Sequence, residues 1–288
     1  MRKRDHRQEF LAQNFLRSPR LVRELVGMSS IGAEDAVYEI GAGKGIITAE
    51  LARVAKRVVA IEKDARLVRA LRERFRVVDD VEVVERDFLT FRIAEREYKI
   101  FASIPYNITA KIVRKILYDR PVPSEAYLIM QKEASNKFAG RPRETLFSVL
   151  AKPFVEFAIL NELKRTDFEP VPNVDSVLLR IRRRKRALIE PEESESFGHF
   201  ASYGFGRWKK NLRSAYSHVF TYAQWRRLAH DLHFPVDATP TDLSFEQWLG
   251  LYWCFRRFVC TEKQAIVLCD RNAGAVNPGR RHRCPPRS

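Results

Sequence analysis

The sequence predicts an open α/β domain with a seven-stranded, mostly parallel sheet, followed by a small all-helical domain. Two observations predict the sheet: short strands that are apolar throughout, and helical segments that separate them. A third predicts the second domain, because strand-like runs stop after about residue 197. We expect the first domain over residues 1–183, the second over 184–262, and a basic, disordered tail over 263–288.

Seven short runs have the composition of buried strands. They are residues 36–40, 57–62, 81–85, 99–104, 126–130, 154–160 and 176–181. Three segments between them show helical periodicity: 45–55, 64–76 and 107–118. In the last of these, Ile108, Ile112 and Ile116 share one face. Strands of this kind, alternating with helices, are typical of a parallel sheet that is covered on both sides.

The composition predicts a partner of opposite charge. The chain has 52 Lys and Arg against 36 Asp and Glu, a formal net charge of +16. Neutralising phosphates is the commonest use of such an excess, so we expect a nucleic-acid partner. The first residues are charged without an apolar signal region, and no apolar run is long enough for a bilayer, so we expect a cytoplasmic protein without membrane attachment. The four cysteines form no Cys-x-x-Cys pair, which argues against a zinc site and a disulfide framework.

A glycine-rich turn follows the first strand of the sheet. The segment EIGAGKGIIT, residues 39–48, places Gly41, Gly43 and Gly45 between a strand and a helix. Such a turn lets the backbone approach a ligand closely. A P-loop is excluded because Gly45, and not Ser or Thr, follows Lys44. A dinucleotide site expects its third glycine one residue later, so the pattern suits a ligand without a pyrophosphate.

Two carboxylates end the next two strands. Glu62 follows Gly41 at the usual interval for a residue that binds ribose hydroxyls, and Asp87 is placed to meet the exocyclic amine of a purine. Neighbouring parallel strands end at one edge of a sheet, so the two carboxylates and the glycine turn should lie together. A nucleoside ligand without phosphate suggests S-adenosylmethionine. The fourth strand ends beside this site, in the residues Ser-Ile-Pro-Tyr at 103–106.

Motifs along most of the chain carry a resemblance to a known family. They are QNFL (13–16), EIGAGKG (39–45), AIEKD (60–64), RDF (86–88), IPYNIT (104–109), QKE (131–133) and FEPVPNVDSVLLRI (168–181). In this order the chain resembles the ribosomal RNA adenine N6-methyltransferases over about residues 8–260. The resemblance implies a Rossmann-like class I methyltransferase fold, S-adenosyl-L-methionine as cofactor and no metal.

The C-terminal segments favour one branch of that family. LSFEQWLGLY (243–252) and VFTYAQWRRL (219–228) are similar to the Erm branch, and RPRETLFSVL (141–150) stands where the small-subunit branch has a different stretch. The Erm resemblance implies N6-dimethylation of a 23S rRNA adenine and resistance to macrolide, lincosamide and streptogramin B antibiotics. Two alternatives stay open: a small-subunit (16S) rRNA adenine dimethylase, and a non-catalytic rRNA-binding factor.

The resemblance also implies roles for individual residues, all of them at the cofactor or at the target base. Asn14 and Leu16 would close over the methionine end of the cofactor. Gly41 would form the floor of the site, with Gly43 in the same turn. The remaining cofactor residues would be Glu62 on the ribose, Asp87 on the adenine amine, and Ser103, which also contacts the target region.

The chemistry predicts what surrounds the target base. The N6 nitrogen of adenine is a weak nucleophile because its lone pair is delocalised, so the site needs acceptors that bind and align the amine. Pro105 restricts Ile104 to extended geometry, which can aim the Ile104 carbonyl into the site. Tyr106 offers a face on which the flipped base can stack, and the resemblance implies that Phe168 is a second aromatic wall on its other side. Ser103 replaces the Asn that is usual in the family, and its shorter arm offers a single hydroxyl.

Basic runs with interleaved aromatics are the expected RNA contacts. They are RIRRRKR (180–186), RWKKNLR (207–213), WRR (225–227) and RR (256–257). The target adenine has to be unpaired or extruded, so we expect the partner to be 23S rRNA, naked or in an assembling subunit. Nothing in the sequence implies an obligate protein partner.

Overall fold

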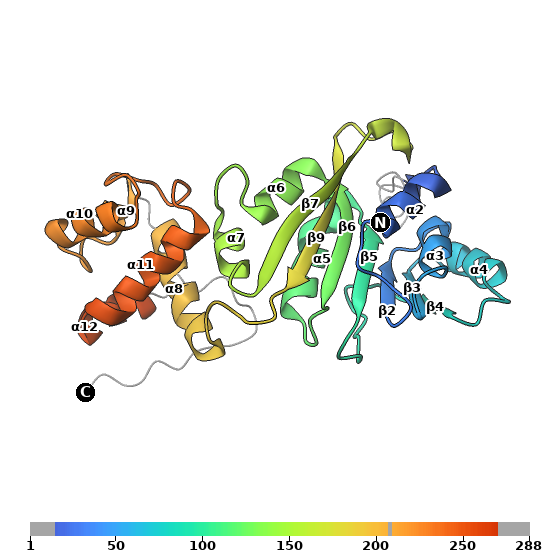
Figure 1. The fold of residues 1–288 in the computed structure, drawn as a ribbon, viewed down its shortest axis with the longest axis horizontal. Helices are drawn as coiled ribbons and strands as arrows, with labels where there is room; N and C mark the ends of the chain where they lie inside the picture. The colour runs from blue at the N-terminus through green and yellow to red at the C-terminus, as the bar shows by residue number, and fades with distance from the viewer. Residues whose placement is uncertain (1–14, 207–208, 270–288) are drawn as a thin grey trace, which may run out of the picture. The chain divides into compact units, whose positions relative to one another are not determined.

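The computed structural model describes residues 15–206 and 209–269 of the chain (Figure 1). The chain divides into two compact units. The first, which we call the sheet unit, comprises Met1–Ser135 and Val155–Arg184. The second, the helical unit, comprises Asn136–Phe154 and Lys185–Ser288. No helix in the described part of the chain is both long and apolar enough to cross a lipid bilayer.

The sheet unit is built on seven strands in the order β4-β3-β2-β5-β6-β9-β7. Their bounds are β2 (Ala36–Ile40), β3 (Arg57–Glu62), β4 (Val81–Glu85), β5 (Lys99–Ser103), β6 (Glu125–Gln131), β7 (Val155–Leu163) and β9 (Ser176–Arg183). The five strands from β4 to β6 are parallel, and β9 runs antiparallel to both of its neighbours. This confirms the predicted seven-stranded, mostly parallel sheet. Because parallel strands end at one edge, the ends of β2, β3 and β5 lie side by side.

Four helices belong to the first half of the sheet unit: α2 (Pro19–Gly27), α3 (Ile46–Leu51), α4 (Ala65–Arg74) and α5 (Thr109–Tyr118). The last three fall within segments of predicted helical periodicity. Helix α2 was not predicted, although Ser18 caps it by accepting a hydrogen bond from the Leu21 amide, with Pro19 at its first position. An ion pair between Arg23 and Glu50, with Nε and Oε2 2.9 Å apart, fixes α2 against α3.

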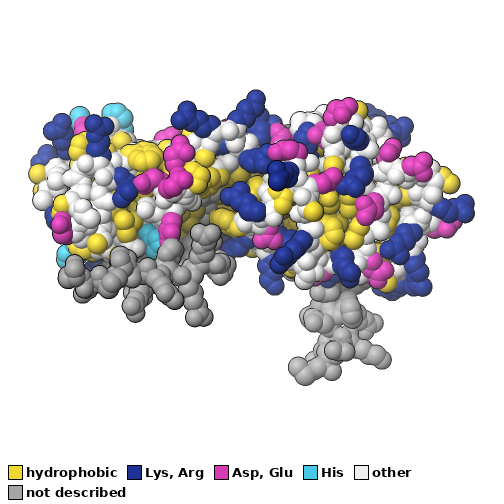
Figure 2. Space-filling model, turned by 90° about the horizontal axis from the view of Figure 1, so that it is seen from below, with side chains coloured by type: hydrophobic (Ala, Val, Ile, Leu, Met, Phe, Trp, Pro, Cys, Tyr) yellow, Lys and Arg dark blue, Asp and Glu magenta, His cyan; other side chains and the backbone are white. Residues whose placement is uncertain are grey.

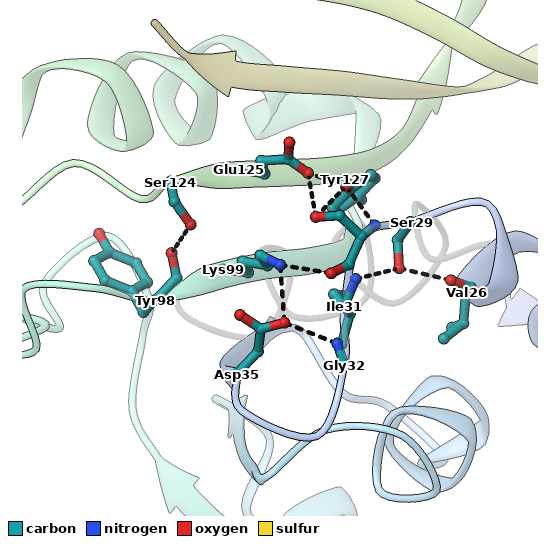
Figure 3. A network of polar contacts seen from close by, with 11 residues as sticks. Val26, Ser29, Ile31, Gly32, Asp35, Tyr98, Lys99, Ser124, Glu125 and Tyr127 are labelled. Atoms are coloured by element: carbon teal, nitrogen blue, oxygen red, sulfur yellow. Dashed lines mark hydrogen bonds and ion pairs between the residues drawn. The ribbon is translucent and has the colours of Figure 1, made fainter. Parts of the chain in front are cut away.

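A polar network anchors the loop between α2 and β2 to the starts of β5 and β6 (Figure 3). The Lys99 ammonium donates to the Ser30 carbonyl at 2.6 Å and pairs with Asp35 at 2.8 Å. The Ser30 hydroxyl donates to Glu125 at 2.7 Å, and the Tyr127 hydroxyl donates to the same carboxylate. Because each buried polar group has a partner, the network fixes the loop that leads out of α2.

A second, two-stranded sheet pairs segments that lie far apart in the sequence. Strand β1 (Phe15–Leu16) runs antiparallel to β8 (Phe168–Glu169), with Leu16 opposite Phe168. The Arg17 amide continues the pairing by donating to the Asp167 carbonyl at 3.0 Å. Two-residue strands carry no periodic signal, so the sequence did not predict them. The pairing brings Phe15 and Leu16, the described residues of the QNFL motif, beside the strand that carries Phe168.

The helical unit packs around aromatic side chains. Beyond α7 (Leu146–Ala151), its helices are α8 (Ser194–Gly206), α9 (Leu212–Ala215), α10 (Tyr222–Asp231), α11 (Phe245–Phe258) and α12 (Thr261–Leu268). The described residues of this unit include no strand, in agreement with the prediction. Phe200, Tyr216, Trp225 and Trp248 are buried together, and the Phe200 and Tyr216 rings stack with centroids 4.9 Å apart. Thr221 and Ser244 begin α10 and α11 with capping boxes.

Two segments differ from the domain limits expected from the sequence. Residues 136–154 group with the helical unit, because Val149 on α7 is fully buried in its aromatic core. Helix α6 (Lys132–Ala139) therefore spans the limit between the units. The expected disordered tail begins within α12, whose Val267 is fully buried, and residues 270–288 lie outside the described part of the chain. The rest of the division into domains stays a prediction.

Candidate active site

The glycine turn after β2 adopts the backbone conformation that its composition predicts. Gly41, Gly43 and Gly45 all have positive φ, at +70°, +57° and +76°. The Gly41 amide donates to the Ile61 carbonyl at 2.8 Å, which joins the turn to β3. A Cβ added at Gly41 would meet no atom within 4 Å, whereas one at Gly43 would lie 2.8 Å from the Phe15 ring. The floor at Gly41 is thus open to a ligand, and Phe15 lies directly against Gly43.

Glu62 ties the glycine turn to the start of the next helix. Its Oε2 accepts from the Gly43 amide at 2.9 Å, and its Oε1 accepts from the amides of Lys63 and Asp64 at 2.8 and 3.0 Å. Only 2% of the residue is exposed. Glu62 therefore lies next to the glycine turn, as the strand order requires. Each carboxylate oxygen has two lone pairs, so binding of ribose hydroxyls is compatible with this geometry and stays a prediction.

Asp87 lies after β4, in an exposed turn. Its Oδ1 accepts from the Leu89 amide at 2.8 Å, and its carbonyl accepts from Thr90. The strand order puts Asp87 at the same edge of the sheet as Glu62. Its expected contact with the cofactor's adenine stays a prediction.

The end of β5 leaves two hydrogen-bond acceptors unused. Strand β5 stops at Ser103, and the Ile104 amide makes one further bond, to the Ile129 carbonyl at 3.0 Å. Pro105 follows with φ −61° and ψ 136° and leads into a short 3₁₀ turn at Tyr106–Ile108. Within residues 15–206 and 209–269, neither the Ser103 hydroxyl nor the Ile104 carbonyl forms a hydrogen bond. Both are available to an amine.

A hydrogen bond fixes the orientation of the Tyr106 ring. The Tyr106 hydroxyl lies 2.9 Å from the hydroxyl of Ser176, a residue at the start of β9 that is 1% exposed. The ring itself is only half-buried. A buried partner at the far end of a half-buried ring holds its plane in place while one part stays accessible. Ser176 was quoted within a family motif, but no sequence pattern assigned it this contact.

Phe168 is less accessible than the sequence predicts. It lies on β8 opposite Leu16, and only 2% of it is exposed. It packs in the same apolar cluster as Leu16 and Tyr127. The expected second wall of the base pocket is therefore mostly a core side chain in this structure. Its contact with a base stays a prediction.

One cavity unites these features. Its lining comprises Phe15, Leu16, 41–44, Ile46, Ile47, 103–106, Ile129 and Phe168. It includes all predicted catalytic residues, and Leu16, Gly41, Gly43 and Ser103 from the predicted cofactor residues. Glu62 and Asp87 are not in the lining, and Asn14 lies outside the described residues. No group of three or more His, Cys, Asp or Glu side chains suited to a metal occurs in the part of the chain that the structure describes.

Two further residues were not predicted as site residues: Phe15, which lines the cavity, and Glu39, which precedes the glycine turn on β2. Phe15 belongs to the quoted QNFL motif, yet only the residues on either side of it received roles. The Lys44 ammonium lies 5.2 Å from the centre of its ring. Glu39 is the first residue of the motif EIGAGKG. Its place near the end of β2, just before the glycine turn, was the signal that could have identified it as a site residue. It is 1% exposed, and the Thr48 hydroxyl donates to it at 2.5 Å.

Burial raises the pKa of Glu39 to about 8, and the hydrogen bond from Thr48 offsets only part of this effect. The nearby Glu62 carboxylate adds repulsion that acts in the same direction. Glu39 is consequently neutral at moderate pH.

We predict that Glu39 makes the folded state less stable as pH rises. Between the ordinary carboxyl pKa and about 8, the folded chain binds a proton that the unfolded chain has lost. The free energy of unfolding therefore falls with pH over this window, by at most about 1.4 kcal/mol per pH unit from this group. Urea denaturation between about pH 5 and pH 8 should show a smaller fall in Glu39→Gln. The exposed-site control Glu85→Gln should keep the wild-type dependence, and an unchanged dependence in Glu39→Gln contradicts the assignment.

The residues present fit S-adenosylmethionine. The positive-φ turn leaves open space at Gly41, the Glu62 carboxylate lies at the tip of the neighbouring strand, and apolar side chains such as Ile47 line the cavity. This is the edge at which open α/β sheets bind their ligands. A nucleoside that carries an aliphatic side chain matches this combination. Its hydroxyls suit the carboxylate, and its side chain suits the apolar lining.

Comparisons with known proteins agree with this geometry. The family model for ribosomal RNA adenine dimethylases matches residues 4–253. An rRNA adenine N-6-methyltransferase of Lysinibacillus sphaericus is 31% identical over 249 residues, which cover 86% of this chain and 96% of the relative. A ribosomal RNA small subunit methyltransferase A of Acaryochloris marina is 28% identical over 254 residues, which cover 83% and 94%.

A solved structure matches both in fold and over the length of the chain. The 23S rRNA methyltransferase ErmE aligns with a TM-score of 0.80 at 28% identity, covering 85% of this chain and all of that one. The match extends across the sheet and into the helices beyond it, since the sheet unit alone is shorter than the share covered. The chain belongs to the ribosomal RNA adenine dimethylase family and is an S-adenosylmethionine-dependent rRNA (adenine-N6)-methyltransferase.

Proposed function

We propose that the target is one adenine of 23S rRNA, and that its N6-dimethylation gives resistance to macrolide, lincosamide and streptogramin B antibiotics. The observation that carries this proposal is the match to ErmE, a 23S rRNA methyltransferase, over 85% of this chain. The Erm-like segments 219–228 and 243–252 form parts of α10 and α11. The reaction takes place in the cytoplasm, on naked 23S rRNA or in an assembling subunit, where the adenine is accessible.

The alternative target is an adenine of 16S rRNA. It is supported by the 28% identity to a small subunit methyltransferase A, which covers 83% of this chain. Both targets require the same chemistry at the sheet unit, so they differ only in which RNA the whole protein recognises.

The unused acceptors at the end of β5 provide the chemistry. Bound S-adenosylmethionine supplies the methyl group as an electrophile. The Ile104 carbonyl accepts one amine hydrogen of the adenine, and the Ser103 hydroxyl lies beside it as a second acceptor. Together they align N6 and favour a more tetrahedral nitrogen with an available lone pair. The proton released from the product nitrogen passes to water.

The aromatic residues hold the base in place. Tyr106, oriented by Ser176, presents the accessible ring on which the extruded adenine stacks. Phe168 supports the opposite side from within the core, where Leu16 packs against it. Strand β1 thereby reaches both Gly43, through Phe15, and the base pocket, through Leu16.

The target RNA is tested with radiolabelled S-adenosylmethionine. We predict that the purified protein labels 23S rRNA and leaves 16S rRNA unlabelled, because the branch-specific segments resemble the Erm branch. Mapping the label to N6 of a single adenine identifies the site. Label in 16S rRNA alone would replace the proposal by its alternative.

We predict that Ser103→Asn raises the fraction of dimethylated product. Asn restores a longer arm with a carbonyl acceptor, whereas Ser offers a hydroxyl that is shorter by about one bond. Mass analysis of the modified nucleoside reports the mono- to dimethyl ratio. Ser103→Ala is the control: it retains activity if the Ile104 carbonyl is the main acceptor. Inactivity of Ser103→Ala with normal cofactor binding would contradict that assignment.

Tyr106 and Phe168 should respond differently to truncation. Tyr106→Ala removes a stacking surface worth about 1–3 kcal/mol, so we expect kcat/KM to fall roughly tenfold to a hundredfold with little loss of stability. Phe168→Ala removes a buried ring and should lower the free energy of unfolding by about 3–5 kcal/mol. Kinetics and urea denaturation separate the two effects. Tyr106→Phe, which keeps the ring but loses the bond to Ser176, should be intermediate in activity; equal stability losses in both alanine variants would refute the distinction.

A further inference from the structure

A stretch of the helical unit carries positive charge without any acidic residue. Residues 197–230 contain no Asp or Glu, but they contain six Lys and Arg: Arg207, Lys209, Lys210, Arg213, Arg226 and Arg227. The described cations among them are exposed. On the face shown in Figure 2, acidic and basic side chains intermingle. This stretch is therefore a local source of positive potential within a chain that is already basic.

An exposed aromatic ring lies within this stretch. Tyr222, the first residue of α10, is 57% exposed. The capping box of Thr221 and Gln224 fixes the start of the helix and thus the position of Tyr222. Trp225, three residues on, fills the core instead and is 1% exposed. Tyr222 is consequently on the solvent face of α10 and does not serve the aromatic core.

Two guanidinium groups lie against the Tyr222 ring. The Cζ atoms of Arg213, from α9, and Arg226, one turn along α10, are 5.5 and 5.9 Å from the ring centre. Both distances are within the range of a cation–π interaction. The two arginines come from different helices and converge on one ring. Their side chains are therefore held in place before any ligand arrives.

These two arginines have no acidic partner among the described residues. Arginines of the sheet unit are commonly paired: Arg23 with Glu50, and Arg182 with Glu156. In α10 itself, Arg227 is 3.5 Å from Asp231. Arg213 and Arg226 thus keep their full charge and their hydrogen-bond donors for a partner.

We propose that Tyr222, Arg213 and Arg226 form a stacking platform for an unpaired RNA base outside the target adenine, with Lys209 and Lys210 contacting the adjoining phosphates. A base can stack on a tyrosine ring or on a guanidinium plane, and arginine donors reach phosphate oxygens at the same time. An acidic peptide would meet the charge but would gain little from the ring. Single-stranded or looped RNA uses both features, and so fits better.

The platform rests on the rRNA methyltransferase activity and not on the choice between 23S and 16S rRNA. It lies in the helical unit, whereas the cavity lies in the sheet unit. The platform contributes no residue to the cavity, so we expect it to act on RNA binding and not on the methyl transfer itself.

The test compares two RNAs that both contain the methylated adenine, a minimal stem-loop and the longer rRNA domain around it. For the longer RNA, Tyr222→Leu should weaken binding about tenfold in fluorescence anisotropy and raise KM with kcat unchanged. Tyr222→Phe keeps the ring and should bind as the wild type does. In the double variant Arg213→Gln with Arg226→Gln, the negative slope of log K against log salt should also become shallower, by about 0.7 for each lost phosphate contact. Binding of S-adenosylmethionine should be unchanged in all three, because the platform contributes no residue to the cavity.

A matched charge control uses Arg69→Gln with Arg72→Gln on α4, where both arginines are exposed and lie outside the platform. This control should bind the longer RNA more tightly than the platform double variant does. Equal binding by both double variants, or wild-type affinity in Tyr222→Leu, would overturn the platform. If the wild type methylates neither RNA, the result counts against the proposed target and not against the platform. The binding measurements are then repeated with the rRNA that accepts the radiolabel.

Discussion

The site depends on how strand β5 ends. A continuing parallel strand would engage the Ile104 carbonyl in the sheet, but Pro105 has no amide hydrogen and turns the chain into the Tyr106–Ile108 turn. The chain therefore delivers an acceptor, the hydroxyl of Ser103 and an aromatic ring to one point at the edge of the sheet. Every other part of the cavity is arranged around that point: the glycine turn beside it, and the β1–β8 pair across it.

Features whose signal lies within a short stretch of residues could be predicted from the sequence. All seven strands of the main sheet showed apolar runs, and the positive φ angles of the glycine turn follow from its composition. The close approach of Glu62 to Gly43 followed from strand order alone. In each case the information lies within a short window, or in the rule that parallel strands end at one edge.

Features that depend on tertiary packing could not be predicted. The β1–β8 pairing has two residues per strand, and it is this pairing that buries Phe168 against Leu16. The bond between Tyr106 and Ser176 joins two distant segments. Residues 136–154 lie between β6 and β7 in sequence but pack in the other unit, because the apolar face of α7 completes the aromatic core there. Such contacts have no local signature.

The most direct measurement is a crystal structure with S-adenosylhomocysteine and an adenosine-containing RNA stem-loop. The account predicts that the adenine N6 lies within about 2.7–3.2 Å of the Ile104 carbonyl oxygen, with the base stacked on Tyr106. A base bound elsewhere in the cavity, or an amine held by a carboxylate such as Asp87, would contradict it.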